Sequence, residues 1–198
     1  MTATAICKKL ILLLVSGSDT GFHSFQMAGM TSPLKIVAAI GLALGGVFGL
    51  AGTLVSEPNL RSTFWGIDGV GLVVAAAILT LKFFRSGDDA VAAGFLVFAI
   101  GEGVMLSGTA QSLEAMVPSF AAGTALWAAA LLLTGIPKVF AVWIRVVSVA
   151  GAILFAATSA RILWGERILP TAFPLPSLGY PLLVLAFLGW IWTLMREN

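Results

Sequence analysis

The sequence predicts an all-α integral membrane protein, a bundle of about six transmembrane helices joined by short loops. Hydrophobic residues make up 59% of the 198 residues, charged residues make up 10%, and the mean hydropathy is +1.04. Soluble domains carry about 25% charged residues. Because a spanning helix needs about 20 apolar residues, a chain of this length has room for roughly six spans and no separate soluble domain.

Residues 1–33 are predicted to be an N-terminal extension, followed by a single six-helix transmembrane domain at 34–198. Two lysines and a short apolar run in the extension resemble a signal peptide in outline, although the run is at or below the usual length. Three interpretations stay open. Translation begins at Met27 or Met30, the extension is a cytoplasmic or interfacial tail, or it is a cleaved signal.

The first predicted span covers about 35–55 and carries a stripe of small residues. Gly41, Gly45 and Gly49 recur at every fourth position, so they lie on one face of a helix. Such a face lets a second helix backbone approach closely. We therefore expect a packing surface here, with a glycine-lined pore wall as the alternative.

The second predicted span covers about 66–84, after a break in the helix at Pro58. Asp68 would then lie in the first helical turn, where a carboxylate complements the helix dipole. A capping role is the expectation for this acid, and an ion site is the alternative.

The third predicted span begins near Asp89 and contains the most unusual residue of the chain. Gly94, Gly101 and Gly108 are spaced by seven, which places them on one face as a second close-packing surface. Glu102 points about 100° away from that face. A carboxylate inside a membrane is costly and is a functional-site hypothesis by default.

The fourth predicted span, about 118–134, opens with a proline at a first-turn position. Trp127 falls near its middle, although tryptophan is enriched at membrane interfaces. A buried packing role is expected, and the indole N–H would then need an acceptor.

The last two predicted spans cover about 138–164 and 177–195, with a proline-rich connection between them. Arg145 and Arg161 lie in the first of these spans and are roughly 160° apart around the helix. Both are candidate partners for a buried acid, and both are near enough to an interface to snorkel to headgroups instead.

The distribution of basic residues predicts that both termini are cytoplasmic. The expected inner boundary carries more bases than the outer one, as the positive-inside rule requires. These inner bases are Lys35, Lys82, Arg85, Lys138 and Arg196. Compactness and short loops favour a bacterial inner membrane.

Common enzyme and cofactor signatures are missing from the sequence. It contains no HExxH motif and no phosphate-binding glycine loop. Cys7 is the single cysteine and His23 the single histidine, and both precede the first predicted span. We therefore expect no catalytic residues, no metal and no cofactor. The scattered bases also predict no nucleic-acid binding.

Three states of Glu102 fit the sequence. It is neutral and hydrogen-bonded to a neighbouring helix, it is ionised and paired with Arg145 or Arg161, or it exchanges protons during transport. A water-filled cavity would also accommodate the charge.

Two functions follow as hypotheses. The first is a non-enzymatic structural or accessory subunit of a membrane complex, because the glycine stripes offer packing surfaces for a membrane-protein partner or a second copy. The alternative is a proton-coupled small-molecule transporter that uses Glu102. In both cases the lipid bilayer is the expected surrounding.

Overall fold

The computed structural model describes residues 32–196, and this part of the chain is all-helical with no strand. It contains six helices that are long and apolar enough to cross a membrane. They are α3 (Ser32–Leu54), α4 (Pro58–Arg85), α5 (Asp89–Leu106), α6 (Val117–Gly135), α7 (Val142–Leu163) and α8 (Gly179–Arg196). The predicted extension at 1–33 lies outside the described residues, except that Ser32 and Pro33 already belong to α3.

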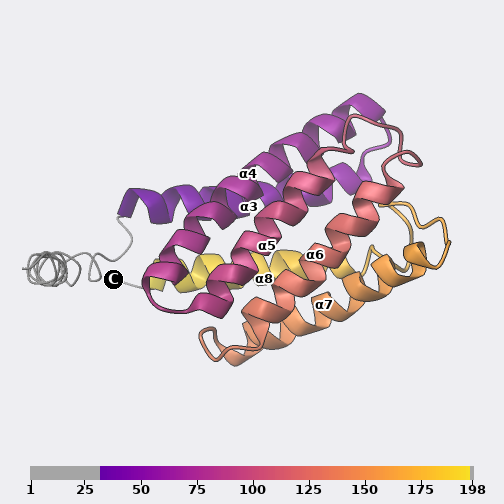
Figure 1. Ribbon diagram of the computed structural model, residues 1–198. Helices are drawn as coiled ribbons and strands as arrows, with labels where there is room; N and C mark the ends of the chain where they lie inside the picture. Colours follow the sequence, from indigo (N-terminus) through magenta and orange to yellow (C-terminus); the bar gives the residue numbers. More distant parts are fainter. Residues whose placement is uncertain (1–31, 197–198) are drawn as a thin grey trace, which may run out of the picture. The chain divides into compact units, whose positions relative to one another are not determined.

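The six helices form a closed ring (Figure 1). Each helix packs against the one before it and the one after it, and α8 closes the ring by packing against α3. Short connections make successive helices antiparallel. In Figure 1, α8 passes behind α5 and α6. The ring therefore has an interior that all six helices can line.

The two ends of the ring differ in their connections. One end carries the starts of α3, α5 and α7 and the C-terminus of α8, together with the predicted inner bases. We call it the basic end. The other end, which we call the loop end, carries the connections at 55–57, 107–116 and 164–178.

The first glycine stripe packs α3 directly onto α4. A Cβ added at Gly41 would lie 2.5 Å from the carbonyl oxygen of Gly71, and one added at Gly45 would overlap the side chain of Leu72. Neither neighbour leaves room for a larger residue. The stripe is thus occupied by a contact within the chain.

The second glycine stripe packs α5 onto α6. A Cβ at Gly94 would lie 2.8 Å from Thr134 Cγ2, and one at Gly101 would lie 3.1 Å from Trp127 Cδ1. Gly108, beyond the end of α5, would meet Ser119 in the same way. Close approach of these two helices leaves an adjacent face of α5, about 100° round from the glycines, directed toward the interior of the ring, and this face carries Phe95, Phe98 and Glu102.

Buried aromatic rings fill the interior from the basic end to about its middle. Their centroids lie 4.8–6.5 Å from those of neighbouring rings, mostly in edge-to-face or stacked geometry. This aromatic core consists of Phe83, Phe95, Phe98, Trp127, Phe140, Phe155, Phe187 and Trp190.

Helix α4 begins about two turns earlier than the sequence predicts. Glu57 is its N-cap, and the Glu57 carboxylate accepts hydrogen bonds from the backbone N–H groups of Leu60 and Asn59. These bonds, with that of Leu60 foremost, lower the pKa of Glu57. Pro58 occupies the first turn, where its missing N–H costs nothing.

The observed ends of α4 and α5 decide where the two acids, Asp68 and Glu102, lie along their helices. Asp68 lies ten residues after Pro58, about 15 Å along the helix, so the first-turn capping role predicted for it is wrong. Helix α5 ends at Leu106, which places Glu102 about 6 Å from the loop-end terminus of its helix.

Candidate functional site

A cavity of about 60 Å³ lies inside the ring, between the aromatic core and the loop end. A water molecule needs roughly 10–15 Å³ of such space, so the cavity holds a few waters or a ligand of a few non-hydrogen atoms. Its lining is mostly apolar, and it contains two acids, Asp68 and Glu102, but no lysine, arginine or histidine.

Glu102 reaches the cavity from α5. The residue is only 2% exposed, and its Oε1 atom has no hydrogen-bond partner among the described residues. Met105 and Thr109 line the cavity from the same face of the chain, three and seven residues further on. The glycine contact with α6 on another face of α5 fixes this direction.

Asp68 reaches the cavity from α4. The residue is partly exposed, whereas its Oδ1 atom is buried and has no hydrogen-bond partner. Its carboxyl group lies against Gly49 of α3, where an added Cβ would be 3.0 Å from Oδ2. Gly49 therefore provides the space that this carboxyl occupies.

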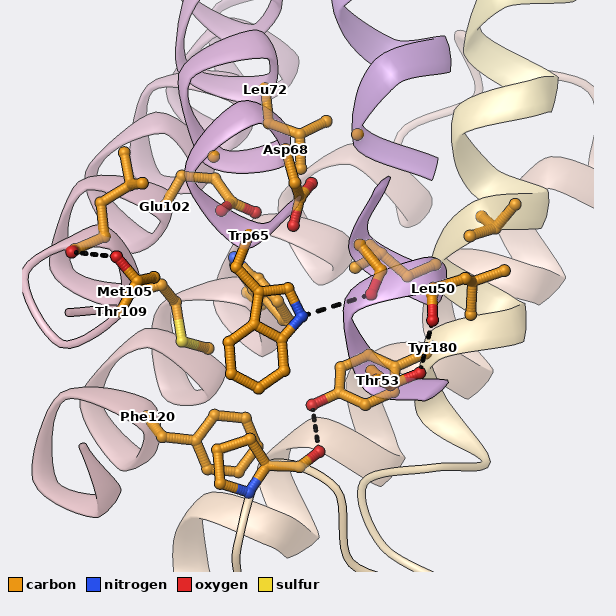
Figure 2. Close-up of a pocket in the computed structure, with 18 of the residues that line it drawn as sticks. Leu50, Thr53, Trp65, Asp68, Leu72, Glu102, Met105, Thr109, Phe120 and Tyr180 are labelled. Carbon is orange, nitrogen blue, oxygen red and sulfur yellow. Dashed lines mark hydrogen bonds between the residues drawn. The ribbon is translucent and has the colours of Figure 1, made fainter. Parts of the chain in front are cut away.

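The two acids form a pair. Both line the cavity, and their carboxyl groups point toward each other across it (Figure 2). Two carboxylates in a low-dielectric site repel each other, so a shared site favours one bound proton or a bound cation. Neither acid forms an ion pair with a base in residues 32–196.

The floor of the cavity is the edge of the aromatic core. Trp127 stacks on Phe98, with ring centroids 6.1 Å apart, and meets Phe155 edge to face. Its indole lies beside Glu102, but its N–H makes no hydrogen bond of normal geometry. The acceptor expected for this buried indole is therefore not provided by a direct contact.

The wall near the loop end is held by hydrogen bonds to the backbone. The Tyr180 hydroxyl donates to the carbonyl oxygen of Pro170 at 2.7 Å, and the Trp65 indole N–H donates to that of Gly49 at 3.4 Å (Figure 2). The proline-rich connection between α7 and α8 thus closes over the cavity through Tyr180.

Neither arginine proposed from the sequence pairs with Glu102. Arg145 donates to the carbonyl oxygens of Gly135 and Ile136 at 3.1 and 2.9 Å, at the end of α6. Arg161 forms a two-point ion pair with Glu166, which lowers the pKa of that glutamate. Both arginines satisfy local groups, which leaves the acid of α5 without the predicted partner.

Asp68 is the site residue that the sequence argument assigned to another role. The N-cap and first-turn proline signals at Glu57 and Pro58 were sufficient to start the helix there and to place Asp68 inside the span. Trp65, three residues earlier, shares the same helical face and the same cavity.

Comparison with protein-family models, curated proteins and solved structures finds no match for this chain. The geometry of the cavity therefore carries the functional argument.

Proposed function

We propose that the protein is a proton-coupled carrier of a small molecule, in which Asp68 and Glu102 share one proton site. The observation that carries this proposal is a pair of facing acids in a cavity without a basic partner. Unpaired ionisable groups inside membrane proteins mark ion and proton pathways. A site that gains and loses a proton, or exchanges it for a cation, accounts for both acids at once.

The glycine stripes give less support to an accessory-subunit function than the sequence indicated. Gly41 and Gly45 contact α4, and Gly94 and Gly101 contact α6. These surfaces are used within the chain, so they are not offered to a partner. The accessory function stays a prediction without an observation of its own.

The proposed setting is a bacterial inner membrane with both termini in the cytoplasm. Bases gather at the basic end, which the positive-inside rule assigns to the cytoplasmic side. The cavity and its Tyr180 wall would then lie nearer the outer face. Large apolar side chains exposed around the ring, such as Ile40, Val70 and Ile153, suit contact with lipid tails.

A flux experiment tests the carrier. Purified protein is reconstituted into vesicles with an acidic interior and a trapped pH-sensitive dye, and mixtures of small metabolites are added outside. We expect some mixtures to accelerate proton efflux in the wild type and none to do so in Glu102→Gln. The matched control is Glu114→Gln, which removes an exposed acid of the loop end and should behave as the wild type.

An infrared titration of the carboxyl bands tests the pair itself. If Asp68 and Glu102 interact, Asp68→Asn shifts the pH at which the Glu102 band titrates, because Glu102 loses a like-charged neighbour. The Glu102 band is assigned by its loss in Glu102→Gln. A Glu102 band that titrates identically with and without Asp68 would overturn the shared proton site.

A further inference from the structure

The cavity combines two acids with aromatic walls. Five aromatic residues line it: Trp65, Phe120, Trp127, Tyr180 and Phe187. Aromatic faces attract cations, most strongly when the cation is shielded from water. Acids and ring faces thus favour the same sign of ligand charge, and an anionic ligand is disfavoured by both.

Only two charged ligands line the cavity, which argues against a bare metal ion. Hard cations take about six or more oxygens. Apart from the acids, the lining offers three hydroxyls, of Thr53, Thr109 and Tyr180, and the part of the chain that the structure describes has no group of three or more Asp, Glu, His or Cys side chains that could hold a metal. The remaining side chains are apolar or indole, so they suit the carbon atoms of an organic cation.

The size of the cavity limits the ligand further. At about 60 Å³ it admits only a few non-hydrogen atoms without rearrangement. An ammonium group also supplies what the acids lack, since its N–H bonds can donate to Glu102 Oε1 and Asp68 Oδ1, which are both buried without partners.

From these observations we infer that the cavity binds a small primary ammonium ion between the Asp68–Glu102 pair and the rings of Trp65 and Trp127. This inference rests on the proposed function, because it names the ligand that exchanges with the shared proton. In the empty site the pair holds one proton. Binding of the ammonium ion releases that proton to solvent and leaves two carboxylates facing one cation, so charge is conserved.

The groups that face the pair from the surrounding helices are compatible with this exchange. Glycine faces Asp68 from α3, Trp127 faces Glu102 from α6, and Tyr180 lines the cavity from α8. On α4 the nearest base in sequence is Arg61, which donates to the carbonyl oxygens of Val55 and Ser56. Proton release is therefore assigned to the two acids.

Proton release on ligand addition tests the inference directly. Methylammonium chloride is added to the detergent-purified protein in weakly buffered solution containing a pH dye, with sodium chloride at equal ionic strength as the reference. We expect release of about one proton per chain with methylammonium, none with sodium, and none in Glu102→Gln or Asp68→Asn. Glu114→Gln should release the same amount as the wild type.

The aromatic contribution has a separate readout. Trp65→Leu should raise the methylammonium concentration for half-maximal release about tenfold, whereas Trp65→Phe, which keeps a ring, should raise it less. Trp164→Leu is the control, because Trp164 is 85% exposed and does not line the cavity. Each variant is first checked for an unchanged elution volume and helix content.

The outcomes separate the inference from the proposed function. Equal proton release with sodium, or no release with methylammonium while the infrared bands of Asp68 and Glu102 still titrate as a pair, would overturn the ammonium ligand and leave the proton site in place. Loss of the coupled infrared titration would instead remove the proton site, and the inference with it.

Discussion

The two halves of the ring interior are built for different purposes. Toward the basic end, rings such as Phe95 and Trp190 meet at a centroid distance of 4.8 Å and fill the space between the helices. Toward the loop end, the same helices surround a cavity in which Asp68 and Glu102 face each other. The half near the basic end is closely packed, whereas the half near the loop end contains a cavity and polar groups without partners.

This difference indicates how a small chain keeps two ionisable groups without partners in its interior. Helix association in a membrane depends on close packing, because lipid tails are as apolar as the side chains themselves. Glycine contacts and aromatic contacts supply that packing between most neighbouring helices. The cavity and its unpartnered polar atoms at the loop end are then tolerated, as expected where function competes with stability.

The largest expected effect comes from breaking the packed half. Phe98 is 1% exposed and touches Trp127, Phe187 and Trp190. Phe98→Ala would leave a void, and because the unfolded protein in detergent also keeps phenylalanine in an apolar surrounding, the void dominates the cost. We expect a loss of about 2 kcal/mol. Unfolding by a denaturing detergent, followed by circular dichroism, measures it.

A matched control for this change is Phe84→Ala. Phe84 is 67% exposed on the outer surface of α4, so the same atoms are removed without leaving an internal void. Its unfolding midpoint should stay close to that of the wild type. Equal losses in the two variants would mean that the aromatic core is not the stabilising half.

In the cavity half, by contrast, a substitution is expected to increase the free energy of unfolding. Glu102→Leu replaces an unpartnered buried carboxyl by an apolar side chain of similar volume, and such replacements are neutral or stabilising. We expect a gain of about 1 kcal/mol in the same unfolding assay, together with loss of ligand-induced proton release. Glu114→Leu should gain nothing. A destabilised Glu102→Leu would show that the acid has a structural partner.

The sequence predicts the structure best for features that depend on a single helix. Apolar composition and turn residues such as Pro58 and Pro118 predict six helices that can span a membrane, and the described residues contain them. The meeting of Asp68 with Glu102 is a property of the ring, because it depends on which faces α4 and α5 turn inward. No spacing in the sequence encodes it.

The arginines illustrate the same limit from the opposite direction. The sequence offers Arg145 as a candidate partner for Glu102, but position along a helix does not decide which neighbour a long side chain reaches. The carbonyl groups at the end of α6 lack helical partners, so Arg145 is drawn to Gly135 and Ile136. Such local competitors are visible only once the helix ends are known.

The smallest expected effect concerns the rim of the cavity half, where Glu57 caps α4. Its folded-state pKa is lowered by the N–H groups of Leu60 and Asn59, so its contribution to stability is present above the ordinary glutamate pKa of about 4.3 and is lost as pH falls through the lowered value. Glu57→Gln should lower the apparent melting temperature slightly at neutral pH and match the wild type in acid. Glu114→Gln is the charge-matched control, because it removes an equal charge from the loop end without removing a side-chain cap hydrogen bond. Melting curves with the same pH dependence for the wild type and Glu57→Gln would show that α4 begins without help from its cap, and the early start that places Asp68 in the cavity would then be due to ring packing alone.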